Sequence, residues 1–160
     1  HLCDAGVNFT FNDHCILKPD FSKPMIPHLA MNADVVVFSL FPGIQENTVR
    51  AILQVNELRS IVMRSFGSGN APQSLWLKHL LESAAKRGIV IVNISQCVAG
   101  SVEMTRYNTG FQLQNTGIVS GYDSTVEAAI TKLMFLQAQH SDPNVIRKLM
   151  NTSLAGEITK

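Results

Sequence analysis

Three short apolar runs separated by amphipathic stretches constrain the fold of this chain more than any other feature. The runs, residues 35–40, 60–64 and 89–94, are rich in β-branched side chains and suit strands that are covered on both faces. Apolar residues at helical spacing occupy the stretches between them, residues 45–58 and 72–87. Alternating strands and helices with short connections imply parallel pairing and right-handed crossovers. The pattern therefore predicts an α/β fold: a three-layer Rossmann-like unit with a small, mostly parallel sheet flanked by helices.

The amino-terminal segment has a different pattern from the rest of the chain. Apolar and polar side chains alternate over residues 7–12, as in a half-buried strand, and three prolines in residues 18–28 indicate an extended connector. We expect residues 1–29 to form this strand and connector and residues 30–160 to form the α/β domain. Since the chain begins at His1 without a methionine, we also expect it to be part of a longer protein.

Three further helices are predicted in the carboxyl-terminal half. A short helix is expected at residues 108–115. Residues 124–127 read Ser-Thr-Val-Glu, a capping box that starts a helix reaching about residue 139. Asp-Pro at residues 142–143 starts the last helix, which is expected to fade near Asn151.

The composition excludes several classes of function. The chain has 160 residues, 46% hydrophobic and 16% charged, so it can bury a core and is globular rather than disordered. A formal net charge of +1 gives no electrostatic footprint for nucleic acid. No apolar run approaches the roughly 20 residues that span a bilayer, and no signal peptide is visible. We therefore expect no nucleic-acid partner and no membrane partner.

The cysteines and histidines do not form a ligand pattern. Cys3, Cys15 and Cys97 are widely spaced and lack a C-x-x-C motif, which argues against a disulfide framework or zinc site and favours a reducing, cytoplasmic compartment. The five histidines have no metal-ligand spacing, so we expect no metal site. No histidine neighbours Cys97 in the sequence, so a buried structural thiol is favoured over a nucleophile.

The most informative segment for function is residues 64–72, which read Arg-Ser-Phe-Gly-Ser-Gly-Asn-Ala-Pro. They join a predicted strand to a predicted helix, at the sheet edge where α/β proteins bind ligands and free N–H groups favour anions. A dinucleotide fingerprint is rejected, because Pro72 replaces its third glycine and no acidic residue ends a following strand. In a structural interpretation, the glycines turn the chain and Asn70 caps the helix.

Arg64 ends a predicted buried strand and therefore needs an anionic partner. That partner is either an internal acid, Glu57 or Glu103, or a bound carboxylate held by both arms of the guanidinium. If the strands are neighbours, about 4.8 Å apart, Arg64 lies beside Ser95 or Cys97. Three predicted loops leave this same edge of the sheet: residues 41–44, 65–71 and 95–100. The residues by themselves thus predict a ligand-binding edge without a catalytic set.

Several motifs in sequence order carry a family resemblance. They are residues 64–72, Gln-Cys-Val-Ala-Gly-Ser-Val-Glu-Met at 96–104, Tyr-Asn-Thr-Gly at 107–110, residues 117–128 and 131–133, and Leu-Ala-Gly-Glu at 154–157. Over about residues 30–157 the chain resembles the carboxyl-terminal half of bacterial cytoplasmic (type I) L-asparaginases. Ser95 stands where these relatives usually have threonine, and Thr105-Arg106 replaces small residues.

The resemblance implies an amidohydrolase that converts L-asparagine and water to L-aspartate and ammonia. In this family a threonine nucleophile and a second threonine-aspartate-lysine group lie in an N-terminal domain, and neither of their motifs occurs in this sequence. The resemblance thus implies no catalytic residue in this chain. We expect the chain to be inactive alone and to work with its own N-terminal catalytic domain, without a cofactor.

The resemblance also implies roles for individual residues. In the family, the asparagine of the G-x-G-N loop reaches the active site of a neighbouring subunit and holds substrate; Asn70 is the matching residue. This implies a homo-oligomer, a dimer or tetramer, formed through the C-terminal domain. Some relatives bind a second asparagine as an allosteric effector, in the region that matches Arg64, Ser95 and Cys97.

Two other interpretations stay open. One is the asparaginase-like subunit of glutamyl-tRNA amidotransferase, which releases ammonia for a partner protein. The other is a non-catalytic module that binds small molecules or mediates dimerisation.

Overall fold

The computed structural model describes residues 3–98, 100–102 and 116–159 of the chain. Its centre is a parallel sheet with strand order β3-β4-β5-β6. The strands are β3 (Val35–Ser39), β4 (Ser60–Ser65), β5 (Val90–Ser95) and β6 (Val119–Ser120). The three predicted strands are confirmed, each within one residue at both ends. The fourth strand, β6, is too short to produce an alternating pattern, and the sequence analysis did not predict it.

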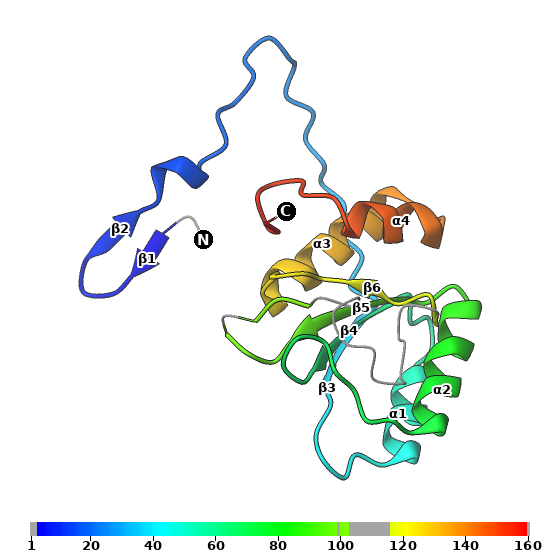
Figure 1. Cartoon of the computed structure of the whole chain (residues 1–160). Coiled ribbons are helices and arrows are strands. Elements are labelled where there is room, and N and C mark those ends of the chain that lie inside the picture. Colours follow the sequence, from blue (N-terminus) through cyan, green and yellow to red (C-terminus); the bar gives the residue numbers. More distant parts are fainter. Residues whose placement is uncertain (1–2, 99, 103–115, 160) are drawn as a thin grey trace.

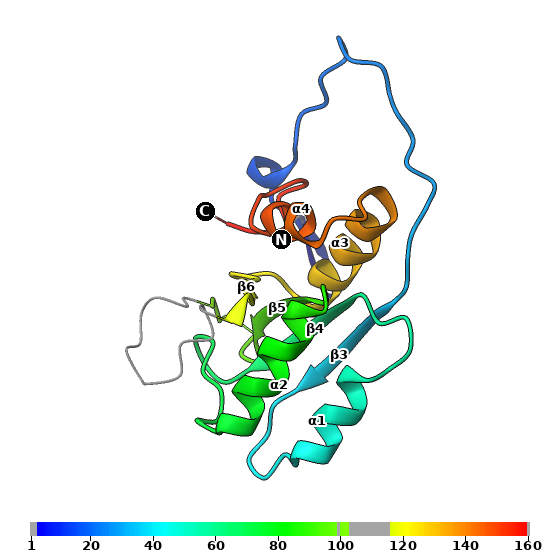
Figure 2. The same cartoon turned by 90° about the vertical axis from the view of Figure 1, so that its right-hand side faces the viewer.

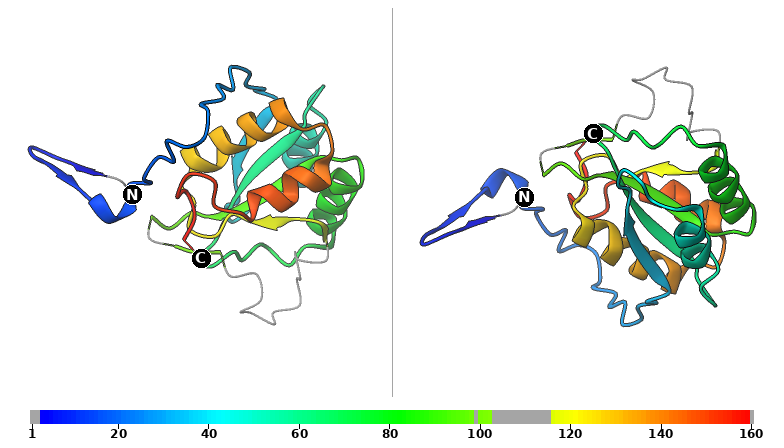
Figure 3. Two further views of the ribbon diagram at one scale, coloured as in Figure 1. Left: turned by 90° about the horizontal axis from the view of Figure 1, so that it is seen from above. Right: turned by 90° about the horizontal axis from the view of Figure 1, so that it is seen from below.

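Helices cover both faces of this sheet (Figures 1 and 2). α1 (Glu46–Leu53) joins β3 to β4 and α2 (Leu75–Lys86) joins β4 to β5; both lie on one face. α3 (Val126–Gln139) and α4 (Pro143–Met150) follow β6 and lie on the opposite face, as Figure 3 shows from above and below. Because right-handed crossovers in a sheet that grows in one direction keep α1 and α2 on one side, the last two helices cover the other. The predicted three-layer α/β fold is confirmed.

Each strand supplies side chains to two separate cores, because successive residues point to opposite faces. Ile61, Met63 and Ile91 are fully buried in the core beneath α1 and α2. Val62 and Ile94 are fully buried in the core beneath α3 and α4. The middle positions of β4 and the first three of β5 are therefore apolar on both faces, which explains the short continuous apolar runs in the sequence.

The predicted start of α2 is wrong. The helix begins at Leu75 with Ser74 at its N-cap position, so Pro72 lies outside it. Asn70 is not a helix cap; its backbone pairs instead with Phe66 in a tight turn. The sequence shows a capping residue and a proline at suitable spacing, but the turn competes for the same backbone groups.

Two other helix boundaries differ from the prediction. α1 ends at Leu53, well before residue 58, and Glu57 has a positive φ of 57° in the turn that leads into β4. The N-cap of α3 is Thr125, whose hydroxyl accepts a hydrogen bond from the Ala128 amide at 3.1 Å; the predicted capping box begins one residue earlier, at Ser124.

The predicted helix that starts at Asp142-Pro143 is confirmed as α4. The Asp142 carboxylate accepts a hydrogen bond from the Asn144 amide at 2.8 Å, and the helix ends at Met150. The short helix predicted at residues 108–115 lies outside the described residues.

The amino-terminal segment extends away from the α/β body (Figure 1). β1 (Cys3–Ala5) and β2 (Phe9–Phe11) form an antiparallel hairpin, followed by the 3-10 helix η1 (Asp13–Cys15) and the predicted extended connector. The half-buried strand predicted at residues 7–12 is only partly correct, because β2 is exposed along its whole length. The connector contacts α3 at His28, whose Nδ1 lies 3.1 Å from Gln139 Oε1, and at Asn32, whose amide donates to the Met134 carbonyl at 3.0 Å.

Candidate functional site at the carboxyl edge of the sheet

The loops that leave β3, β4 and β5 contact one another, as predicted from the parallel order. The Leu40 amide donates to the Arg64 carbonyl at 2.8 Å, and the Gln96 amide donates to the Ser65 carbonyl at 3.0 Å. The Gln96 side-chain amide donates to the carbonyls of Leu40 (2.6 Å) and Arg64 (2.9 Å). Gln96 therefore ties the three strand ends together. The sequence analysis assigned it no role, although a glutamine directly after a buried strand is a usable signal.

Asn70 lies at the exposed tip of this edge. Its amide donates to the Phe66 carbonyl at 2.8 Å, and the Phe66 amide donates back to the Asn70 carbonyl at 2.9 Å, which closes the turn. Gly67 and Gly69 both have positive φ angles, 50° and 113°. A Cβ on Gly69 would lie 2.8 Å from Val102 Cγ1, so this position also needs a glycine for space. Asn70 is thus an exposed residue on a closed, well-packed loop whose backbone groups are hydrogen-bonded within the turn.

Two side chains of β5, Ser95 and Asn93, donate hydrogen bonds to the backbone of this loop. The Ser95 hydroxyl donates to the Gly67 carbonyl at 2.6 Å, and the Asn93 side-chain amide donates to the Gly69 carbonyl at 3.2 Å. The Ser95 hydroxyl also accepts a hydrogen bond from the Cys97 amide at 2.9 Å. Ser95 and Cys97 therefore lie together, next to the Asn70 loop. Cys97 is an exposed free thiol, so the interpretation as a buried structural cysteine is wrong.

Arg64 is half-buried and pairs in register with Ile94. Its Nε is buried, and within the described part of the chain it has no hydrogen-bond partner. Glu57 precedes β4, whereas Arg64 is near its end, so at roughly 3.3 Å per residue more than about 13 Å of strand separates them. Glu57 is therefore not the internal partner, and Glu103 lies outside the described residues.

Arg64 and Ser95 end neighbouring strands, but their side chains leave opposite faces of the sheet. Arg64 follows Val62 and neighbours Ile94 on the side of α3 and α4, whereas Ser95 follows Asn93 on the other side. Among the described residues, no hydrogen bond joins the Arg64 guanidinium to Ser95 or Cys97. The structure thus brings Ser95 and Cys97 together and places Arg64 next to them along the edge.

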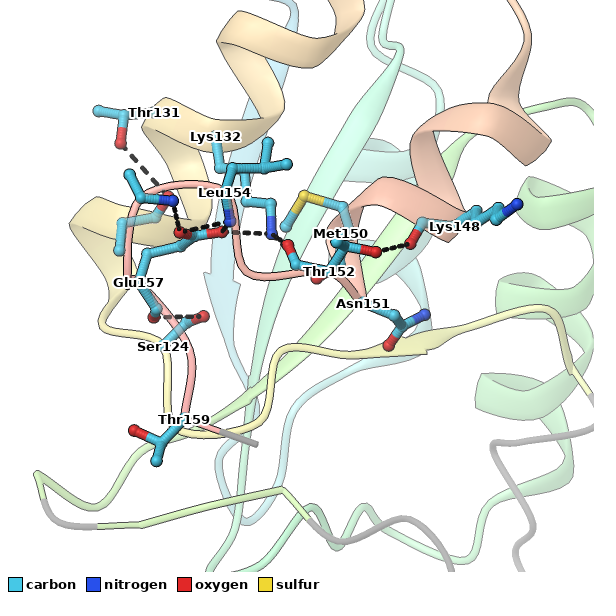
Figure 4. A network of polar contacts seen from close by, with 12 residues as sticks. Ser124, Thr131, Lys132, Lys148, Met150, Asn151, Thr152, Leu154, Glu157 and Thr159 are labelled. Carbon is cyan, nitrogen blue, oxygen red and sulfur yellow. Dashed lines mark hydrogen bonds and ion pairs between the residues drawn. The ribbon is translucent and has the colours of Figure 1, made fainter. Parts of the chain in front are cut away.

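A second polar cluster fastens the carboxyl-terminal segment to α3 (Figure 4). Lys132 Nζ lies 2.5 Å from Glu157 Oε1 and donates to the Thr152 carbonyl at 2.6 Å. The Glu157 carboxylate also accepts hydrogen bonds from the amides of Leu154 and Ala155. Burial by itself would raise the pKa of Glu157, but the Lys132 ammonium and these amides outweigh burial and lower the pKa from 4.5 to about 2.

The carboxyl-terminal segment that this cluster holds also contacts the loop between β6 and α3, which in turn contacts Val102 near the candidate site. The Thr159 amide donates to the Asp123 carboxylate at 2.8 Å, in the loop between β6 and α3. In the same loop, the Tyr122 carbonyl accepts a hydrogen bond from the Val102 amide at 2.9 Å. Val102 also packs beside Gly69. A continuous series of contacts therefore runs from the carboxyl-terminal segment through the loop between β6 and α3 to the Asn70 loop.

Within residues 3–98, 100–102 and 116–159, no group of three or more histidine, cysteine or acidic side chains is arranged to hold a metal ion. Helices in the same ranges are all too short or too polar to cross a membrane.

The chain is a parallel α/β domain with a closed Gly-x-Gly-Asn loop at the carboxyl edge of its sheet, the edge at which α/β proteins bind ligands. Residues 34–150 match the family described as Glutaminase/Asparaginase C-terminal domain. The chain therefore belongs to the glutaminase/asparaginase C-terminal domain family.

Individual relatives give the same result. The chain is 41% identical over 141 residues to L-asparaginase 1 of Escherichia coli (strain K12), which covers 88% of this chain and 41% of that protein. It is 38% identical over 159 residues to the 60 kDa lysophospholipase of Homo sapiens, which covers 99% of this chain and 27% of that protein. The crystal structure of L-asparaginase I from Vibrio cholerae O1 is similar with a TM-score of 0.86 and 33% identity, covering 99% of this chain and 48% of that one. The chain thus spans less than half the length of each of these relatives.

Proposed function

We propose that this chain is the C-terminal domain of an amidohydrolase that converts L-asparagine to L-aspartate and ammonia. The observation that carries the proposal is the presentation of Asn70 at the sheet edge, in a domain of the asparaginase family. The proposal assigns no catalytic residue to this chain, so the nucleophile comes from an N-terminal catalytic domain. The three free cysteines are compatible with work in the cytoplasm.

In this proposal Asn70 binds substrate. Its amide has two donors and an acceptor on one planar group, which suits the carboxylate and the amino group of an amino acid at the same time. Because Asn70 lies on an exposed loop, it is able to enter the active site of a neighbouring subunit. The protein is accordingly a homo-oligomer assembled through this domain.

Arg64 is the proposed anchor of an effector asparagine, together with Ser95 and Cys97. The specific support is the buried Nε that lacks a partner within the described ranges, since a guanidinium normally satisfies its donors. A carboxylate is the ligand group that fits this fork best. The proposal predicts sigmoidal dependence of rate on asparagine in the complete protein, and hyperbolic dependence in Arg64→Ala. Hyperbolic kinetics in the unmutated protein would argue against an effector site.

The decisive experiment measures ammonia release from L-asparagine by the complete protein, by residues 1–160 alone, and by the Asn70→Ala variant of the complete protein. We expect turnover by the complete protein, none by residues 1–160, and a KM raised about tenfold in Asn70→Ala, which corresponds to about 1.4 kcal/mol. Ser74→Ala is the matched control, because the Ser74 side chain makes no capping hydrogen bond and lies beyond the loop. An unchanged KM in Asn70→Ala would refute the role of Asn70.

The same assay separates the two alternatives. Ammonia release that requires glutamyl-tRNA and a partner subunit would identify an amidotransferase subunit. If the complete protein shows no turnover under either condition, but calorimetry detects asparagine or aspartate binding, the chain is a non-catalytic binding module.

A further inference from the structure

The loop that carries Asn70 is held by side chains from a different strand. Ser95 and Asn93 lie two residues apart on β5, so both point to the same face of the sheet. The Ser95 hydroxyl donates to the carbonyl of Gly67, and the Asn93 amide donates to the carbonyl of Gly69. The two hydrogen bonds therefore fix the loop at alternate positions immediately before Asn70.

We infer that Ser95 and Asn93 are positioning residues that set the orientation of Asn70. This inference rests on the substrate role proposed for Asn70 above. It gives both side chains the task of holding the Asn70 loop, which for Ser95 comes in addition to its proposed place in the effector region. Through these two residues β5 contributes to substrate binding.

The hydrogen-bonding capacity of Ser95 supports this assignment. A serine hydroxyl has a single donor, and the Ser95 donor is occupied by the Gly67 carbonyl at 2.6 Å. The same oxygen accepts from the Cys97 amide at 2.9 Å. Ser95 thus connects the Cys97 loop to the Asn70 loop through one atom.

Close packing around Ser95 leaves its hydroxyl little freedom to leave this position. A Cβ on Gly100 would lie 2.2 Å from Ser95 Oγ, so the chain returns over Ser95 at a distance that only glycine allows. The bond to Gly67 is therefore enforced by packing as well as by its own energy.

The burial of Asn93 is a second, independent argument. Asn93 is 0% exposed and lies between the apolar residues Val92 and Ile94, and its Oδ1 has no hydrogen-bond partner in the described part of the chain. A buried amide that is only partly satisfied reduces stability compared with an apolar side chain of similar size. The bond to Gly69 explains why a polar residue occupies this position.

The first test needs no enzymatic activity. Amide hydrogen exchange is followed by NMR at Gly69 and Asn70, whose amides bond to the Phe66 carbonyl and report closure of the loop. We expect Ser95→Ala to accelerate exchange at these amides about fivefold and Ser95→Thr to leave it unchanged, because threonine keeps the hydroxyl. Asn93→Leu should accelerate exchange at Gly69. Unchanged exchange in both Ser95→Ala and Asn93→Leu would overturn the inference.

Ser60→Ala is the matched control for stability. Ser60 is also a strand serine with a hydrogen-bonded hydroxyl, which donates to Gln137 at 3.0 Å, but it is fully buried and lies at the amino end of β4. It should leave exchange at Gly69 and Asn70 unchanged. Equal acceleration in Ser60→Ala and Ser95→Ala would show a general loss of stability and overturn the positioning role.

The second test is kinetic, in the complete protein. Ser95→Ala should raise the KM for asparagine about fivefold in the unmutated background and should have no further effect when Asn70 is already alanine. The same rise in both backgrounds would overturn the inference. If Ser95→Ala loosens the loop while Asn70→Ala leaves KM unchanged, the positioning is supported and the substrate role of Asn70 is refuted.

Discussion

Neutralising Glu157 by the substitution Glu157→Gln should destabilise the domain by about 2–3 kcal/mol at pH 7. The Lys132 side chain is only 5% exposed, and Glu157 is its counter-charge at 2.5 Å. Removing one partner from a fully buried pair costs about 3–5 kcal/mol. The cost is lower here, because Lys132 keeps its bonds to the carbonyls of Thr152 and Met150 and Glu157 is 13% exposed.

The lowered pKa of Glu157 gives a second estimate of the free energy that the charged carboxylate contributes to folding. The fall from 4.5 to about 2 corresponds to a preference of about 3 kcal/mol for the charged form in the folded chain. Because the pKa is lower in the folded state, this stabilisation is complete above about pH 5 and disappears as the pH falls toward 2. The difference in unfolding free energy between the unmutated chain and Glu157→Gln should therefore shrink steadily over this range.

The assay is urea unfolding followed by circular dichroism at pH 7, 5, 4 and 3, which gives the unfolding free energy at each pH. Thermal unfolding at pH 7 should show a fall in melting temperature of roughly 5–10 °C. Glu82→Gln is the matched control: its carboxylate pairs with Lys78 at 3.8 Å on the exposed side of α2, so we expect a change of about 0.5 kcal/mol or less. A Glu157→Gln effect as small as that of Glu82→Gln, or one that does not change with pH, would refute the reasoning.

Three further substitutions test local parts of the argument by thermal or urea unfolding. Thr125→Ala should cost about 1 kcal/mol, because the hydroxyl caps α3, whereas Ser124→Ala should cost less; equal costs would restore the predicted capping box. Asn70→Ala should change stability by no more than about 0.5 kcal/mol, and a loss of 1 kcal/mol or more would mean that its side chain has a structural role. Gly69→Ala should cost about 1–3 kcal/mol, because its φ is 113° and the added Cβ meets Val102; an unchanged stability would contradict the close packing of the loop.

The sequence predicts where the candidate site lies, but not the contacts that its residues make. The apolar runs and helical spacings locate the carboxyl edge, because parallel order follows from short connections. The sequence does not show which side chains connect the loops at that edge. Gln96 contacts the carbonyl of Leu40, 56 residues away in the sequence, and no local pattern reports such a contact. Asn70 was assigned to a helix cap by spacing, but its backbone closes a turn onto Phe66.

The sequence by itself determined the layered α/β fold and the start of α4, because side-chain periodicity and the Asp142-Pro143 cap act between residues a few positions apart. Tertiary structure decided what the site contains. The hydrogen bonds from Ser95 and Asn93 to the asparagine loop span 28 and 24 residues. They require that β4 and β5 pair in one particular register, and that register is a property of the packed sheet rather than of either strand.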